Sequence, residues 1–282
     1  MKLEYKGKEL NLDAPKIMGI LNVTPDSFSD GGRYADHEAA VAHAREMVLA
    51  GASIIDVGGE STKPGAQSVS VQEELDRVIP VVETVAREMD VWISVDTSSP
   101  EVMAAALDAG ARMINDVRAL RREGAIEIVA ERGCPVCIQH MPCLEPAQMQ
   151  DCTEYSDLIG DISMFLYSRL HECMNAGIKR EHIIIDPGFG FGKTLDQNFR
   201  LLGQLDRFSS FALPILVGMS RKSMIGGLLN QPVNERLSGS IAAALYAVHK
   251  GASIVRVHDV KETADALRVY SYAEQFAKRK RK

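Results

Sequence analysis

The sequence of 282 residues lacks any long apolar run, because no stretch of about 18 consecutive apolar residues occurs and none opens the chain. A helix that crosses a bilayer needs about 20 such residues, and a secretion signal needs an apolar segment close to the amino terminus. We therefore expect a soluble, cytoplasmic protein with no membrane partner.

Cysteine is scarce, and its pattern does not suit disulfides. The chain has five cysteines, an odd number, whereas disulfide frameworks belong to short secreted chains with an even number. Cys134 and Cys137 have the spacing of a redox or zinc pair. Cys137, however, falls inside an expected strand, and the sequence contains no second pair that would complete a zinc site. We expect inert, buried thiols.

A surplus of positive charge is also missing. Lysine and arginine number 32 against 38 acidic residues, which leaves a net charge of -6. This balance argues against nucleic acid or a membrane surface as a partner of the whole protein. We interpret the basic run at residues 278–282 as a solvated tail and assign it no function. An anionic substrate would need a local basic pocket.

No linker rich in proline, serine or glycine divides the chain, and 46% of its residues are hydrophobic, which is enough for one large core. We expect a single domain over residues 1–282. Over residues 1–14, apolar and polar residues alternate on both sides of a turn at Lys6, Gly7 and Lys8. That pattern predicts a β-hairpin, which we place at the bottom of the domain.

Eight short segments rich in β-branched residues follow, separated by amphipathic stretches whose apolar residues lie three and four positions apart. The expected strands cover residues 17–23, 53–57, 91–96, 113–117, 135–140, 183–186, 215–218 and 254–258. This alternation predicts an α/β fold, a parallel TIM (β/α)8 barrel. A doubly wound open sheet is the alternative, but it would not place so many polar strand ends around one mouth.

Polar residues stand at or just after the ends of the expected strands. They are Asn22, Asp56, Asp96, Asn115, His140, Asp186, Ser220, Arg256 and His258. Barrel enzymes carry their active sites at the carboxyl ends of the strands. Because side chains alternate along a strand, we expect Asp96, Asp186 and Arg256 to point inward and to share the mouth.

Three of these residues, Asp96, Asn115 and Asp186, offer acceptors that suit a flat heterocycle rich in N–H donors. Buried carboxylates are costly without a partner, so a ligand or a cation has to satisfy them. Internal salt bridges or hydrogen bonds between strand ends are the alternative interpretation.

A second group of residues is cationic or favours anions. It comprises Ser61, Thr62, Arg221, Lys222, Arg256 and His258. Gly58 and Gly59 would allow the backbone to approach a ligand closely. Such residues around one opening fit a phosphate or a diphosphate, because arginine can bind two oxygens at once. Ordinary ion pairs at the barrel rim would give the same pattern.

Two long loops, at residues 22–36 and 58–70, are rich in glycine, serine, proline and aspartate. This composition predicts mobile loops that close on a ligand, unless they are exposed Ω-loops without a function. The glycines of residues 186–193 do not have the GxGxxG spacing, so we reject a dinucleotide site. We expect Phe189 and Phe191 either to stack on an aromatic substrate or to pack in the core.

Seven segments together resemble the dihydropteroate synthase family, in the family's order and nearly from end to end. They read GILNVTPDSFSDGG, IIDVGGEST, SVDTS, INDV, IIDPGFGFGK, GMSRKSMIG and RVHDV. The resemblance implies a TIM barrel that condenses (7,8-dihydropterin-6-yl)methyl diphosphate with 4-aminobenzoate in folate biosynthesis, giving 7,8-dihydropteroate and diphosphate. It also implies Mg²⁺ as cofactor, a homodimer and sensitivity to sulfonamides.

The resemblance further implies a role for each matching residue. The pterin would be held by Asp96, Asn115, Asp186 and Lys222. The diphosphate would be held by Thr62, Arg256 and His258, and the magnesium ion would meet Asn22. The 4-aminobenzoate site would be shaped by Pro64, Phe191 and Ser223, with Phe28 of the first loop beside it. The catalytic residues would be Asp96, Asp186, Lys222, Arg256 and His258.

Two positions depart from the family pattern. Lys63 stands where the family usually has arginine, and Cys143 stands where glycine is expected in the segment after His140. Two alternatives stay open, the first because it could share Asp96, Asn115 and Asp186, and the second because of these two departures. One is a related pterin-binding barrel that transfers a methyl group from methyltetrahydrofolate to a corrinoid, and the other is a pterin-binding paralogue without enzymatic activity.

Lys63, which we place among the substrate-binding residues, keeps the charge of the family's arginine but loses its forked pair of hydrogen bonds. We expect Lys63→Arg to lower the Michaelis constant for the diphosphate substrate or for 4-aminobenzoate by about 2- to 10-fold. Steady-state kinetics of both proteins measure the change. Unchanged Michaelis constants for both substrates would contradict a direct role of Lys63.

Overall fold

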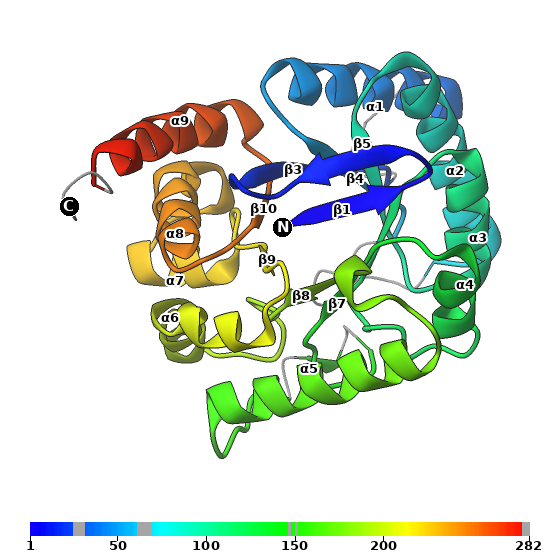
Figure 1. Cartoon of the computed structure of the whole chain (residues 1–282). Coiled ribbons are helices and arrows are strands. Elements are labelled where there is room, and N and C mark those ends of the chain that lie inside the picture. The colour runs from blue at the N-terminus through cyan, green and yellow to red at the C-terminus, as the bar shows by residue number, and fades with distance from the viewer. Residues whose placement is uncertain (25–31, 61–68, 146–147, 150–151, 278–282) are drawn as a thin grey trace.

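The computed structural model describes residues 1–24, 32–60, 69–145, 148–149 and 152–277. At its centre lies an eight-stranded parallel sheet in the order β8-β7-β6-β5-β4-β3-β10-β9, which a bridge between Ile185 and Ile215 closes into a ring. The strands are β3 (Lys16–Asn22), β4 (Ile54–Gly58), β5 (Trp92–Asp96), β6 (Met113–Asp116), β7 (Val136–Gln139), β8 (Ile183–Asp186), β9 (Leu216–Val217) and β10 (Ile254–Val257). The ring, visible in Figure 1, confirms the predicted barrel and excludes the open sheet.

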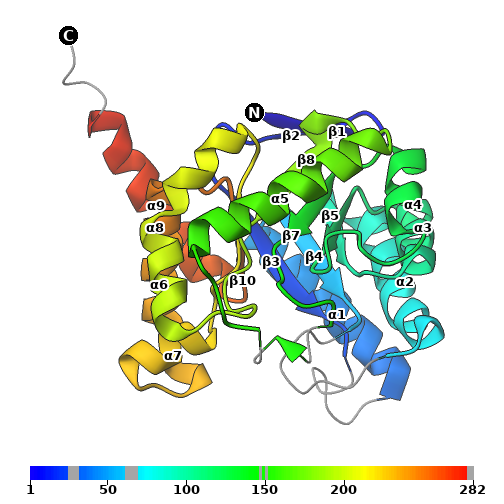
Figure 2. The same ribbon diagram turned by 90° about the horizontal axis from the view of Figure 1, so that it is seen from below.

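Helices surround the ring on its outer side (Figures 1 and 2). They are α1 (Gly32–Leu49), α2 (Val71–Glu88), α3 (Pro100–Ala109), α4 (Ala125–Arg132), α5 (Leu158–Asn175), α6 (Leu195–Gly203), α7 (Ser223–Leu229), α8 (Leu237–His249) and α9 (Val260–Ala277). Short 3-10 helices cover η3 (Arg180–His182), η4 (Leu205–Phe211) and η5 (Val233–Glu235). Each strand of the ring therefore lies between the barrel interior and a layer of helices.

Local sequence explains where two of these helices begin. Before α2, the Ser70 hydroxyl accepts a hydrogen bond from the Glu73 backbone N–H at 3.3 Å, and the Glu73 carboxylate accepts one from the Ser70 N–H at 3.2 Å. This reciprocal capping satisfies two backbone donors that the first helical turn cannot pair. Pro100 opens α3, where its missing N–H costs no hydrogen bond.

The predicted hairpin is present as β1 (Lys2–Tyr5) and β2 (Lys8–Asn11), which pair antiparallel. Leu3 and Leu10 face the core and are buried. The Lys6 ammonium donates to the Leu107 carbonyl oxygen at 2.9 Å, near the end of α3 that leads into β6. The hairpin therefore covers the amino-terminal end of the barrel strands, as predicted, and Figure 2 shows it at one end of the barrel.

Burial decides several open questions about single residues. Phe189 is 1% exposed and belongs to the main core, so the core alternative holds for this side chain. Cys134 and Cys137 are fully buried, and burial raises the pKa of the Cys134 thiol to about 12. Such thiols are unreactive, as expected. In the part of the chain that the structure describes, no helix is long and apolar enough to span a bilayer.

Candidate active site

Strand register brings the polar strand ends into one layer at the carboxyl end of the barrel. Asn22 of β3 is the partner of Gly58 of β4, and Gly58 is the partner of Asp96 of β5. Asp96 is in turn the partner of Asn115 of β6. Four successive strands therefore present these residues at the same height. Asp186 ends β8 on the same rim, opposite Gln139 of β7.

Arg256 of β10 joins two carboxylates across the barrel interior. Its Nε donates to Asp56 Oδ2 at 2.6 Å, and its Nη2 donates to Asp96 Oδ2 at 2.7 Å. The internal salt bridge that we named as an alternative is therefore present at Asp96. It joins two residues that the sequence analysis placed in the same mouth but assigned to different parts of a ligand, Arg256 to the anion and Asp96 to the heterocycle.

Asp56 is a site residue whose importance the sequence analysis missed, although its place at a strand end was noted. Asp56 Oδ2 also accepts a hydrogen bond from Asn115 Nδ2 at 3.1 Å. Asp56 Oδ1 and Asn115 Oδ1 are buried, and among the described residues neither has a hydrogen-bond partner. Buried acceptors without donors are costly, so this part of the mouth suits a ligand that brings N–H groups.

Asp186 and Lys222 form the other half of the mouth. The Gly188 backbone N–H donates to Asp186 Oδ1 at 2.7 Å. The Lys222 ammonium donates to the Phe189 carbonyl oxygen at 2.5 Å and lies 4.7 Å from the centre of the Phe191 ring. Burial lowers the pKa of Lys222 to about 8, against the opposing effect of Asp186. Phe191 thus borders the mouth rather than the main core, unlike Phe189.

The remaining candidate residues at the rim, His258, Ser223 and Arg221, differ in their partners. His258 follows β10, and its Nδ1 is 3.0 Å from the Ser220 hydroxyl. Ser223 is exposed at the first position of α7. Arg221 forms an ion pair with Asp259, with Nε to Oδ2 at 3.0 Å. The expectation that Arg221 serves an anion is therefore weakened, because a rim carboxylate already neutralises it.

Several of the predicted site residues lie outside the described part of the chain. They are Phe28 of the first loop and Ser61, Thr62, Lys63 and Pro64 of the second. Their roles stay predictions from the sequence.

Arg118 is a further residue that sequence reasoning did not single out. Its guanidinium pairs with Glu60 at 3.2 Å and with Glu145 at 2.8 Å, and its Nη1 donates to the Ser98 hydroxyl at 3.0 Å. These partners follow β4, β7 and β5, so one buried side chain ties together segments at the rim. A lone arginine after a strand end gave no pattern from which this could be predicted.

The loops after β7 and β8 meet at distances that admit no side chain. A Cβ on Gly188 would lie 1.9 Å from the His140 carbonyl oxygen. A Cβ on Gly192 would lie 2.4 Å from the Pro142 ring and 2.7 Å from the Cys152 carbonyl oxygen. Both glycines have positive φ angles, 76° and 59°, which most other residues adopt only with strain.

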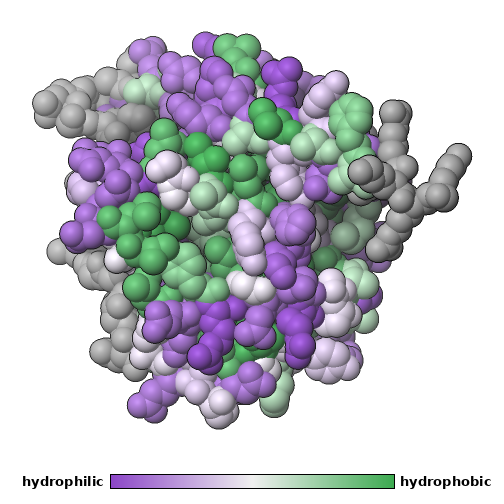
Figure 3. All heavy atoms as spheres, turned by 90° about the vertical axis from the view of Figure 1, so that its left-hand side faces the viewer, coloured by the Kyte–Doolittle hydropathy of each residue, from purple (hydrophilic) through white to green (hydrophobic). Residues whose placement is uncertain are grey.

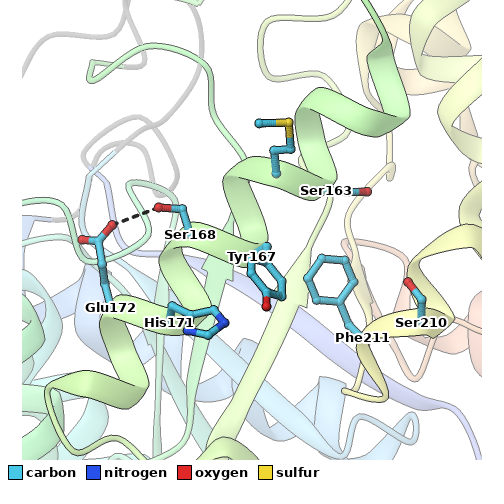
Figure 4. A pocket seen from close by; sticks show the side chains of 8 residues that line it. Ser163, Tyr167, Ser168, His171, Glu172, Ser210 and Phe211 are labelled. Atoms are coloured by element: carbon cyan, nitrogen blue, oxygen red, sulfur yellow. Dashed lines mark hydrogen bonds between the residues drawn. The ribbon is translucent and has the colours of Figure 1, made fainter.

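A groove of about 650 Å³ opens elsewhere, on the outer surface between α5 and η4 (Figure 4). Met164, Tyr167, His171 and Phe211 are among its lining residues. None of its lining residues belongs to the strand-end layer described above. The convergence of buried charges and unpaired acceptors therefore places the candidate active site at the barrel mouth.

The buried Asp96 carboxyl generates a prediction about pH. Burial raises its pKa from 3.8 to about 7, although Arg256 acts in the opposite direction. At a pH between these two pKa values, Asp96 is protonated in the folded protein but ionised in the unfolded chain. The free energy of unfolding therefore falls as the pH rises through this window. In Asp96→Asn, the free energy of unfolding should decline less between about pH 4 and 7 than in the unchanged protein.

Urea denaturation at a series of pH values measures this difference. Asp90→Asn serves as the control, because Asp90 is exposed and a hydrogen bond from Lys8 lowers its pKa. Asp90 therefore stays ionised over most of the window, and its substitution should leave the slope unchanged. Parallel curves for Asp96→Asn and the unchanged protein would contradict the raised pKa.

Comparison with known proteins agrees with this geometry. The family model described as "Pterin binding enzyme" matches residues 18–258. The chain is 55% identical over 269 residues to the dihydropteroate synthase of Escherichia coli (strain K12), and the match covers 95% of each chain. The family match therefore includes the carboxyl ends of all eight strands of the described ring.

Solved structures give the same result. A Yersinia pestis dihydropteroate synthase in complex with a sulfonamide drug has a TM-score of 0.93 and 51% identity, covering 98% of this chain and 100% of that one. A dihydropteroate synthase from Xanthomonas albilineans in complex with 7,8-dihydropteroate has a TM-score of 0.89 and 44% identity, covering 97% and 99%. The chain belongs to the family of pterin-binding enzymes and, within it, to the dihydropteroate synthases.

Proposed function

We propose that this chain condenses (7,8-dihydropterin-6-yl)methyl diphosphate with 4-aminobenzoate, giving 7,8-dihydropteroate and diphosphate. One observation carries the proposal. Buried acceptors on Asp56 and Asn115 lack donors among the described residues, directly beside an arginine that is bound to Asp56 and Asp96. A substrate that joins an N–H-rich ring to an anionic tail matches this juxtaposition. The Xanthomonas albilineans relative was solved with the proposed product.

The ring end of the substrate would lie among the acidic residues. Pterin N–H and amino groups can donate to Asp96, Asn115 and Asp186, which offer carboxylate and amide oxygens. Hydrogen bonds to charged groups contribute more than neutral ones, about 1.5–3 kcal/mol each. Lys222, whose charged form Asp186 favours electrostatically, can donate to a ring acceptor. Acceptors from three residues and a donor from Lys222 therefore fix the orientation of the ring.

The reaction then needs charge stabilisation rather than a protein nucleophile. The bond between the methylene carbon and the diphosphate oxygen breaks, and its electron pair leaves with the diphosphate. Arg256 and His258 stabilise the negative charge that develops on the leaving group. Asp96 and Asp186 stabilise positive charge on the pterin methylene. The amine of 4-aminobenzoate forms the new C–N bond, and its nitrogen then loses a proton.

Magnesium is proposed as the cofactor, with Asn22 as its protein ligand. Asn22 is half-buried at the end of β3, and its Oδ1 would lie 3.9 Å from a Cβ on Gly58, so its amide oxygen borders the mouth. Within the described residues, no cluster of three or more acidic, histidine or cysteine side chains is suited to a metal. A single amide oxygen fits Mg²⁺, which commonly keeps waters and binds substrate phosphates. When bound, it would neutralise charge on the diphosphate.

Release of diphosphate tests the proposed function. With both substrates and Mg²⁺, the protein should release diphosphate, and chelation of the metal should lower the rate by about 10-fold or more. Added Mg²⁺ should restore the rate. A sulfonamide should raise the apparent Michaelis constant for 4-aminobenzoate and leave kcat unchanged.

Two other results would favour the other candidates. No diphosphate release in this assay, together with methyl transfer from methyltetrahydrofolate to a corrinoid in a separate assay, would indicate the methyltransferase. Pterin binding with no turnover under any of these conditions would indicate the non-enzymatic paralogue.

We also propose that two copies of the chain form a homodimer. Exposed apolar side chains gather over α7, η5, α8 and α9, on the side shown in Figure 3. They include Leu228, Leu229, Val233, Tyr246, Val269 and Tyr272. Extended apolar patches mark interaction surfaces, and a two-fold pair is the commonest way for identical chains to cover one.

Sedimentation velocity tests the dimer. The unchanged protein should sediment with twice the 30.9 kDa mass of one chain. Tyr246→Glu should shift it to the single-chain mass, because a carboxylate would be buried in the interface. Met164→Glu is the control, since Met164 is also a large exposed hydrophobic residue, 73% exposed against 46% for Tyr246, but lies on α5. A single-chain mass for the unchanged protein would rule out the dimer.

A further inference from the structure

Lys193 is a buried lysine that the proposed reaction does not use. Its ammonium is 3.0 Å from His140 Nδ1, 2.8 Å from the Gly188 carbonyl oxygen and 2.9 Å from the Phe191 carbonyl oxygen. An ammonium has three donors, and here three acceptors receive them. The side chain is 8% exposed, so this pairing is what makes its burial tolerable.

The groups around Lys193 act in opposite directions on its charge. Burial lowers the pKa of Lys193 to about 7, while Asp186 favours the charged form, and Lys222 and Cys143 are the other titratable groups close enough to act on it. Burial and the neighbouring ammonium keep the pKa of His140 well below its usual range. A neutral His140 can offer Nδ1 as an acceptor, which a charged imidazole could not.

The segment that Lys193 holds is the same one that positions the mouth. Between residues 188 and 191, the Gly188 N–H binds the Asp186 carboxylate, and the Phe189 carbonyl oxygen binds the Lys222 ammonium. The Phe191 ring lies beside the same ammonium. Lys193 binds this segment at both of its ends, at Gly188 and Phe191.

The backbone of this segment needs such an anchor. Gly188, Gly190 and Gly192 all have positive φ angles, of 76°, 82° and 59°. Glycines give up more conformational freedom on ordering than other residues, so a glycine-rich turn is held only by what binds it. Asn198 supplies a second hold, because its Oδ1 accepts from the Gly190 N–H at 2.7 Å and its Nδ2 donates to the Lys193 carbonyl oxygen at 3.0 Å.

We propose that Lys193 is a positioning residue that acts through Lys222. By fixing the carbonyl groups on both sides of Phe189, it aims the Phe189 carbonyl oxygen at the Lys222 ammonium and so keeps that ammonium beside Asp186. The inference rests on the proposed function, because the place of Lys222 matters only if the mouth binds the pterin substrate. Lys193 itself does not touch the substrate.

A double-mutant cycle tests this role. Lys193→Met keeps the side-chain length and removes all three donors. It should lower kcat/KM for the pterin diphosphate by about 10-fold or more. In a Lys222→Met background the same change should have little further effect, since the residue through which it acts is already gone. If kcat/KM of the double variant falls by the product of the two single-variant factors, Lys193 does not act through Lys222 and the proposal is overturned.

Two further variants keep the test decisive. Lys6→Met removes a lysine–carbonyl hydrogen bond at the opposite end of the barrel, and its kinetic constants should equal those of the unchanged protein. If Lys193→Met does not fold, His140→Phe removes one acceptor while keeping an aromatic ring against Phe165. Its smaller loss of kcat/KM should also disappear in the Lys222→Met background, and persistence there would overturn the proposal.

Failure of the proposed function would be recognised separately. If the unchanged protein releases no diphosphate, the same cycle is read from the dissociation constant of 6-hydroxymethyl-7,8-dihydropterin, measured by calorimetry. Non-additive losses of affinity would support the role of Lys193 even then. Additive losses, or no loss in Lys193→Met, would contradict it.

Discussion

The ion pair of Arg256 with Asp56 and Asp96 is the interaction on which the barrel mouth depends. Two carboxyl groups are buried here beside an arginine side chain that is 20% exposed, and an ionised carboxylate would be costly there without this partner. Their pairing is possible because the closed ring directs these side chains of β4, β5 and β10 into a common interior. Removing one member would leave an unpaired charge, and the same geometry keeps neighbouring oxygens of Asp56 and Asn115 available for a ligand.

Much of this architecture follows from short-range sequence patterns. Alternating strands and helices predicted the barrel, and the alternation before Lys6 and after Lys8 predicted the hairpin. The inward direction of Asp96, Asp186 and Arg256 followed from the two-residue period of a strand. These predictions held because each depends on residues that are neighbours in the chain, where backbone geometry leaves few choices.

Contacts between distant segments were not predictable in the same way. Asp56 and Arg256 are 200 positions apart, and the stagger of the barrel strands decides which inward residues meet. The same limit applies to Arg221, whose charge is neutralised by Asp259, and to Lys193, whose three acceptors lie on two loops. Burial was also hard to predict from the sequence. Phe189 and Phe191 are only two positions apart, yet Phe189 packs in the core and Phe191 borders the mouth.

The close approach of the loops after β7 and β8 has a consequence for protein engineering. Because Gly188 meets the His140 carbonyl oxygen and Gly192 meets Pro142 directly, neither loop has room to vary independently of the other. A chimera that imports one of these loops from another barrel would have to import its neighbour as well. The two segments form one exchangeable module, although Gly188 lies 48 positions after His140 and helix α5 stands between them in the chain.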